Sequence, residues 1–173
     1  LGAVVKADAY GHGAVRCAQT FAEAGAAWLA VSRLTEALEL RRAGQALPIL
    51  ILGRTDPCFA GVLAAHRITQ CCYSLPYARA LAAEAQSAGV TVDIHLKADT
   101  GMGRIGFALR SSFDTALPEM LTAAGLPGLR LPRLFQHCSA PPAAGAARAA
   151  STATPHATFH PTPLPPPAAA PAP

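Results

Sequence analysis

Short apolar runs alternate with helix-like segments over residues 1–139 of this chain. Short apolar runs bounded by turn residues predict strands, and segments of helical period that end at Gly predict helices. We expect six strands, at 1–5, 28–31, 48–52, 68–73, 90–96 and 129–135, and helices at 14–24, 34–43, 59–65, 75–88 and 111–123. Repeated strand–helix units build a parallel sheet with right-handed crossovers, so the expected fold class is α/β.

Two architectures satisfy this repeat, an open doubly wound sheet and a closed TIM-type (β/α)8 barrel. Periodicity alone does not separate them. A complete barrel typically takes about 250 residues, whereas this chain has 173 residues and six expected strands. A barrel built from this sequence is therefore incomplete.

The composition changes sharply after residue 139. Residues 140–173 contain thirteen Ala and ten Pro, and no acidic residue follows Glu119. Such a segment buries too little apolar surface to offset its ordering entropy, so we expect a disordered, low-complexity tail. Its origin is either a natural Pro-Ala tail or a GC-rich coding region translated in a shifted frame.

Charge and hydropathy exclude two classes of partner. The formal net charge is +4, but residues 1–119 hold eleven basic and ten acidic residues, so the excess lies outside the predicted folded part. This distribution argues against a nucleic-acid-binding face. No apolar run approaches the roughly 18 residues of a membrane helix.

The five cysteines are odd in number, and their spacing matches no zinc site, so no metal centre is expected. Free thiols are typical of a reducing compartment, and we expect a cytoplasmic protein. The adjacent Cys71 and Cys72 are interpreted as core residues.

The chain contains only two lysines, whereas its other twelve Lys and Arg residues are arginines. An amine can lose its proton and attack a carbonyl, which a guanidinium does not do. Lys6 ends the first predicted strand in Leu1-Gly-Ala-Val-Val-Lys-Ala-Asp-Ala-Tyr-Gly-His-Gly13. The Gly amides, the start of the next helix and the Tyr10 hydroxyl suggest a phosphate site beside it. A lysine beside a phosphate site suggests pyridoxal phosphate held as a Schiff base; on the residues alone, a surface lysine before a loop is favoured over it.

Lys97 begins the second motif, Lys97-Ala-Asp-Thr-Gly-Met-Gly-Arg-Ile-Gly-Phe107. Its three glycines allow the backbone to pass close to a flat cofactor, with Arg104 as a donor to a phenolate or carboxylate. The segment is not a P-loop, because no Gly-Lys-Ser/Thr follows.

The first motif resembles the pyridoxal-phosphate attachment motif of bacterial alanine racemases, which are fold-type III enzymes. The segment His95-Leu-Lys-Ala-Asp-Thr-Gly-Met-Gly-Arg-Ile-Gly106 is similar to the second signature of that family. Intervening segments, such as Glu36-Ala-Leu-Glu-Leu-Arg-Arg-Ala-Gly44, resemble it in the same order. The resemblance covers residues 1–139 and implies the N-terminal barrel domain of the family.

The resemblance implies a role for five residues. Lys6 would carry the cofactor and act as one of two catalytic bases, and Tyr10 would bind the cofactor phosphate. Arg104 would contact the phenolic oxygen of the cofactor and help to bind substrate. Lys97 would be carbamylated (N6-carboxylysine) and would orient Arg104. His137, in a strand that matches less well, would support them.

The implied activity is interconversion of L-alanine and D-alanine, which supplies D-alanine for peptidoglycan, in a homodimer. In the family, the opposite base and further cofactor ligands come from later segments that have no counterpart here. We therefore expect this chain to be inactive, and insoluble or partly molten, and the break after residue 139 favours a frameshift. The alternatives are an inert cofactor-binding remnant and another fold-type III enzyme.

Overall fold

The computed structural model describes residues 1–137, and the predicted tail at 140–173 lies outside the described residues. The described residues form one parallel sheet in the order β1-β2-β3-β4-β5, with β6 and β7 both paired to β5. The strands are β1 (Gly2–Val4), β2 (Trp28–Val31), β3 (Ile49–Ile51), β4 (Ile68–Cys72), β5 (Val92–Asp99), β6 (Phe107–Ala108) and β7 (Leu129–Gln136). The six predicted strands are confirmed, and the two-residue β6 was not predicted.

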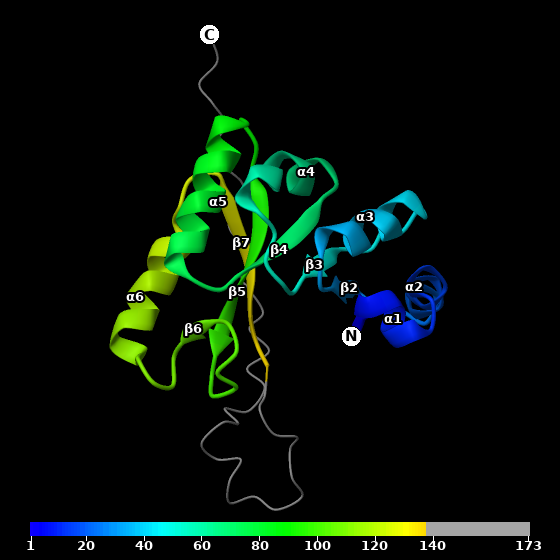
Figure 1. The fold of residues 1–173 in the computed structure, drawn as a ribbon, viewed down its shortest axis with the longest axis horizontal. Helices are drawn as coiled ribbons and strands as arrows, with labels where there is room; N and C mark the ends of the chain where they lie inside the picture. The colour runs from blue at the N-terminus through cyan, green and yellow to red at the C-terminus, as the bar shows by residue number, and fades with distance from the viewer. Residues whose placement is uncertain (138–173) are drawn as a thin grey trace, which may run out of the picture. The chain divides into compact units, whose positions relative to one another are not determined.

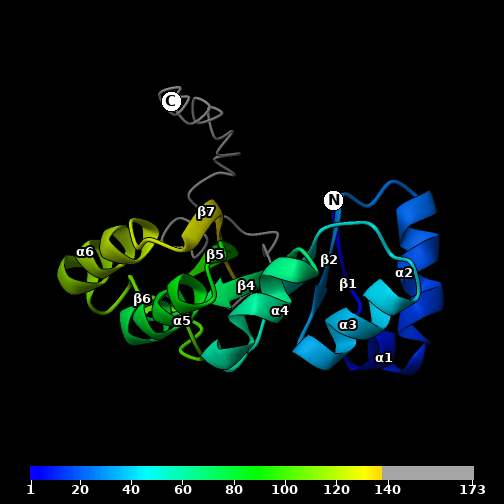
Figure 2. The same ribbon diagram turned by 90° about the horizontal axis from the view of Figure 1, so that it is seen from above.

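The predicted helices are also present, and the short element α1, which was not predicted, precedes them. The helical elements are α1 (Lys6–Gly11), α2 (Ala14–Glu23), α3 (Leu34–Arg42), α4 (Ala60–Ala65), α5 (Leu75–Ser87) and α6 (Phe113–Ala124), with a 3-10 turn at Pro57–Phe59. α3, α4 and α5 lie on the same side of the sheet (Figures 1 and 2). A doubly wound sheet would carry helices on both faces, so this arrangement favours a segment of a barrel wall.

Alternation along the strands places the core between the sheet and these helices. Leu29 and Val31 of β2, and Ile49 and Ile51 of β3, have no exposed surface. The helices present small or branched side chains to this layer, namely Ala37, Leu40, Leu63, Ala78 and Leu81. The core thus fixes the strands whose ends carry the predicted site. Within residues 1–137, no helix combines the length and apolarity needed to cross a bilayer.

Arg41 of α3 connects two crossovers through its guanidinium. The group donates four hydrogen bonds of 2.7–3.0 Å to main-chain carbonyls, those of Gln45, Leu47, His66 and Arg67. These carbonyls lie in the segments just before β3 and β4. A planar fork of donors suits this task, whereas a point-like ammonium would satisfy fewer acceptors.

We expect Arg41→Ala to lower the free energy of unfolding by about 2–4 kcal/mol, because four carbonyl acceptors lose one charged donor together. Chemical denaturation of the chain followed by circular dichroism would measure the change. The exposed neighbour Arg42 provides a matched control, and Arg42→Ala should change stability by less than about 0.5 kcal/mol. Equal effects of the two substitutions would contradict the role given to Arg41.

Candidate active site

The carboxyl ends of the parallel strands meet at one edge of the sheet, and the predicted site residues lie along that edge. Lys6 follows β1 after one residue, and His137 directly follows β7. Lys97 lies near the end of β5, where it pairs with Phe135 of β7. The sheet order leaves β2, β3 and β4 between β1 and β5, so the two lysines lie at the ends of strands that are not neighbours.

Lys6 opens a left-handed turn that the sequence analysis did not predict. The φ angles of Ala7, Asp8, Ala9 and Tyr10 lie between +50° and +57°, and their ψ angles lie between +34° and +52°. The turn brings Tyr10 back over the lysine, so that Lys6 Nζ lies 5.8 Å from the centroid of the Tyr10 ring. This distance is within the range of a cation–π contact. The structure therefore brings together the first two predicted site residues.

Left-handed backbone costs an L-residue roughly 1–2 kcal/mol, so the turn needs external support. Two main-chain bonds of 3.0 Å close it, from Ala9 N to Val5 O and from Gly13 N to Asp8 O. The Asp8 carboxylate then accepts a 2.6 Å bond from the amide of Ala14, the first residue of α2. The amide of Ala14 is therefore occupied by Asp8, and the phosphate site expected at the start of this helix stays a prediction for the amides that follow it.

Lys97 is almost fully buried, with 6% of its surface exposed. Desolvation by burial lowers its pKa, and the charge of Arg104 lowers it further, whereas Cys71 and Asp99 act in the opposite direction. Within residues 1–137, no carboxylate lies within 4.0 Å of the Lys97 amine. A buried amine with a lowered pKa spends more time uncharged, and the uncharged form is the nucleophile.

The glycine-rich loop after Lys97 is organised by Asp99, which the sequence analysis left without a role. Its carboxylate accepts the amides of Gly101 at 2.9 Å and Gly103 at 3.1 Å. These bonds are the main reason why the pKa of Asp99 is lowered. An Asp that bonds amides two and four residues later is typical of an Asx-type turn, so the Asp-x-Gly-x-Gly spacing carried a usable signal.

Arg104 and His137 are both exposed, and no hydrogen bond joins either of them to another residue in the described part of the chain. The loop holds Arg104 close enough to Lys97 for its charge to affect the lysine. In the β5–β7 register, Ala98 pairs with Gln136, so His137 comes next to the end of β5. Both residues therefore lie at the predicted edge, and the roles expected for them stay predictions.

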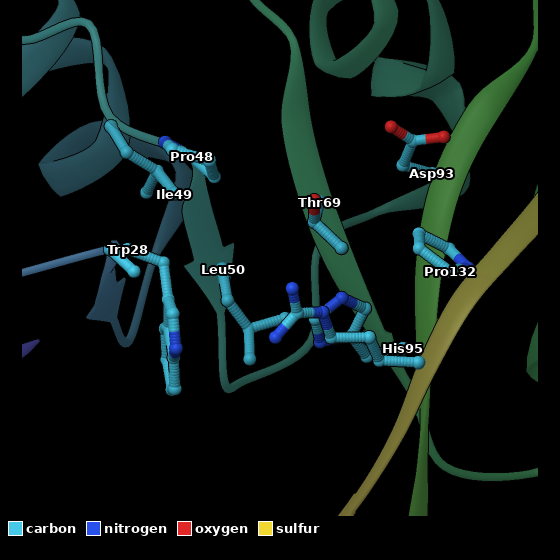
Figure 3. A pocket seen from close by; sticks show the side chains of 10 residues that line it. Trp28, Pro48, Ile49, Leu50, Thr69, Asp93, His95 and Pro132 are labelled. Atoms are coloured by element: carbon cyan, nitrogen blue, oxygen red, sulfur yellow. The ribbon is translucent and has the colours of Figure 1, made fainter. Parts of the chain in front are cut away.

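A hollow of about 230 Å³ lies on the sheet, away from the predicted site. Leu50, Thr69 and His95 project into it from three neighbouring strands (Figure 3). None of the predicted site residues lines it. Burial lowers the pKa of His95 to about 4, with a smaller effect from Arg133 in the same direction, so this imidazole is neutral near pH 7. The hollow is lined by residues in the first half or middle of the strands, and the site predicted at their carboxyl ends is a separate place.

Comparison with known families shows which family the chain belongs to. The family model described as "Alanine racemase, N-terminal domain" matches residues 1–160. The chain belongs to the alanine racemase family. An alanine racemase of Desulforamulus reducens is 45% identical over 135 residues, which is 78% of this chain and 36% of that protein. One of Clostridium perfringens is 47% identical over 137 residues, which is 79% of this chain and 35% of that protein.

Solved structures of the family support the same assignment. The alanine racemase of Clostridium difficile 630 superposes with a TM-score of 0.73 and 37% identity, over 80% of this chain and 36% of that one. A histidine racemase from Leuconostoc mesenteroides gives a TM-score of 0.70 and 33% identity over the same shares. The chain thus spans about a third of the length of the relatives it matches. The alanine racemase fold expected from the sequence is confirmed for residues 1–137.

Proposed function

We propose that residues 1–137 provide the cofactor-anchoring part of the active site of a pyridoxal-phosphate-dependent alanine racemase, with Lys6 as the anchoring amine. The observation that carries the proposal is the left-handed turn at the end of β1, which holds the Tyr10 ring 5.8 Å from Lys6 Nζ. An amine for an aldehyde and a phenol for a phosphate converge there, and this donor set fits the cofactor. The relatives named alanine racemase, at 45–47% identity, support the same activity.

Each residue of the proposed site has a defined task. When bound, pyridoxal phosphate withdraws electrons from the amino acid and so acidifies its Cα proton. Lys6 would anchor the cofactor through its amine and, once the substrate amine has displaced it, would take or return that proton on one face of the substrate. The Tyr10 hydroxyl donates to the phosphate and orients it.

The second motif, at the end of β5, would contact the cofactor at its phenolic oxygen. The buried amine of Lys97 would react with carbon dioxide and release a proton, and its lowered pKa favours the uncharged form that reacts. The resulting carbamate is an anion that can pair with the Arg104 guanidinium and direct it to the cofactor phenolic oxygen and the substrate. His137 is proposed as a supporting residue at the same edge.

The substrate is proposed from the names of the relatives, and the assembly from the family resemblance of the two motifs. Alanine is the proposed substrate because the two relatives named above are alanine racemases. A cytoplasmic homodimer is the assembly that the resemblance implies. Racemisation needs a base on each face of Cα, and among the described residues only Lys6 is placed for this work. The histidine racemase of similar fold makes another amino acid the alternative substrate.

Borohydride trapping tests the assignment of Lys6. The chain is mixed with pyridoxal phosphate, reduced, digested and mapped by mass spectrometry. We expect a pyridoxyl group on Lys6, because this lysine is only half-buried beside a phosphate-binding phenol, whereas Lys97 is buried. With two lysines in the chain, the map has two possible side-chain positions. Trapping on Lys97, or on the Leu1 amine alone, would contradict the proposal.

A further inference from the structure

The side chain of Glu36 connects the segments that follow β1 and β2, beyond the last main-chain hydrogen bond between these two strands. Glu36 is the third residue of α3, and its Oε2 accepts the amides of Ser32 at 2.7 Å and Arg33 at 3.1 Å. Both bonds are local, and the one from Arg33, the N-cap residue of α3, is the bond that the N3 glutamate makes in a capping box. Its other oxygen, Oε1, accepts the amide of Ala7 at 2.9 Å, across 29 residues of sequence.

The Ala7 amide has a special position, because Ala7 directly follows Lys6 and is the first residue of the left-handed turn. Pairing between β1 and β2 ends two residues before Ala7, at the 2.8 Å bond from Val5 N to Ala30 O. The main chain of Lys6 is therefore fixed on both sides, by a sheet bond before it and by the Glu36 carboxylate after it. In the described residues, Glu36 is the only side chain that bonds the Ala7 amide.

The contact needs a carboxylate. Three amide donors converge on the two oxygens of one anion, and charge-assisted bonds of this kind are about twice as strong as neutral ones. A glutamine side chain has one acceptor oxygen and one NH2 donor, so it can accept from the Ala7 amide or from the Ser32 and Arg33 amides, but not from both groups. An alanine can serve neither side, and the Ala7 amide would then face solvent while the turn keeps its backbone strain.

We propose that Glu36 is a positioning residue for Lys6: it fixes the start of the left-handed turn and so directs the lysine amine and Tyr10 to the same point. The inference rests on the proposed function of Lys6 and extends it to a side chain on a different strand–helix unit. Glu36 acts through the backbone and does not touch the cofactor. Its loss therefore leaves the reactive groups present but lowers the share of molecules in which they converge.

Two measurements on the 173-residue chain test this role. Glu36→Ala and Glu36→Gln are compared with Glu39→Gln, which removes a charge from an exposed position of the same helix. Hydrogen exchange at Ala7 reports whether the turn is held. Borohydride trapping with pyridoxal phosphate reports the ratio of adduct on Lys6 to adduct on Lys97 within one molecule, and this internal ratio is insensitive to the overall yield.

We expect Glu36→Ala to speed exchange at Ala7 and to lower the Lys6 to Lys97 ratio by about tenfold or more. Glu36→Gln should fall between Glu36→Ala and the parent chain, and Glu39→Gln should match the parent. An unchanged ratio in Glu36→Ala would overturn the proposal. Global unfolding of both Glu36 variants, seen by circular dichroism, would also overturn it, because Glu36 would then be a residue of general stability.

The same data separate this inference from the function on which it rests. If the parent chain forms no adduct on Lys6, the proposed function fails. The Glu36 contact is then judged by exchange at Ala7 alone, where equal rates in Glu36→Ala and Glu39→Gln would reject it.

Discussion

Replacing Lys6 by alanine is expected to abolish the covalent adduct and to slow racemisation by about 10⁴-fold or more, because the anchor and one catalytic base are lost together. The assay for turnover uses a hybrid in which residues 1–137 are joined to the later residues of the Desulforamulus reducens relative, which is 45% identical over 135 residues. D-alanine formation from L-alanine is measured at saturating pyridoxal phosphate.

A matched variant distinguishes the chemistry of Lys6 from its charge. Lys6→Arg keeps a cation beside the Tyr10 ring but provides no amine that can bond the aldehyde, so it should be as inactive as Lys6→Ala. Methylamine added to the alanine variant should restore part of the rate by replacing the lost amine. Activity of Lys6→Arg above one hundredth of the parent value would remove Lys6 from the role of anchor.

Gly106→Ala is expected to cause the larger of two stability losses in the loop after Lys97, at least about 3 kcal/mol. The φ angle of Gly106 is +137°, a conformation that L side chains rarely adopt. A Cβ there would lie 2.9 Å from both the Lys97 carbonyl oxygen and the Asp99 amide nitrogen. Both atoms belong to the backbone of β5, which is held by the sheet and cannot shift cheaply.

Gly103→Ala is the control within the same loop. Its φ angle of +69° is also positive, but a Cβ there would meet no atom within 4 Å. The expected loss is therefore the conformational cost alone, about 1–2 kcal/mol. Chemical denaturation of both variants gives the comparison, and equal losses would show that the close approach of Gly106 to β5 is not what limits the loop.

The strands and helices could be predicted because their signals are local. Trp28–Val31 was predicted to the residue, since an apolar run between polar or small neighbours leaves few alternatives. β5 runs to Asp99, three residues past the predicted end. Lys97 and Asp99 made that end look like a loop, although they alternate with the buried Leu96 and Ala98. To choose between an open sheet and a barrel, one must know whether the helices cover one face of the sheet or both. The periodicity of the sequence does not contain that information.

The candidate site was predicted in its residues but not in its geometry. Nothing in the run Ala7 to Tyr10 signals four successive positive φ angles, because it contains no glycine and two of its residues are good helix formers. The turn is instead imposed by contacts made elsewhere in the chain. One of them comes from Glu36, whose carboxylate bonds the Ala7 amide across 29 residues of sequence, beside the paired strands β1 and β2. A long-range hydrogen bond of this kind has no local sequence pattern.

The turn after Lys6 is the mirror image of a right-handed helical turn. Its handedness is unfavourable for L-residues by roughly 1–2 kcal/mol each, and by symmetry it is the preferred conformation of D-residues. A chain made by chemical synthesis with D-alanine at positions 7 and 9 should therefore hold the turn with less strain than the natural chain. The backbone that carries the proposed anchoring lysine would then accept D-alanine, one of the two enantiomers that an alanine racemase interconverts.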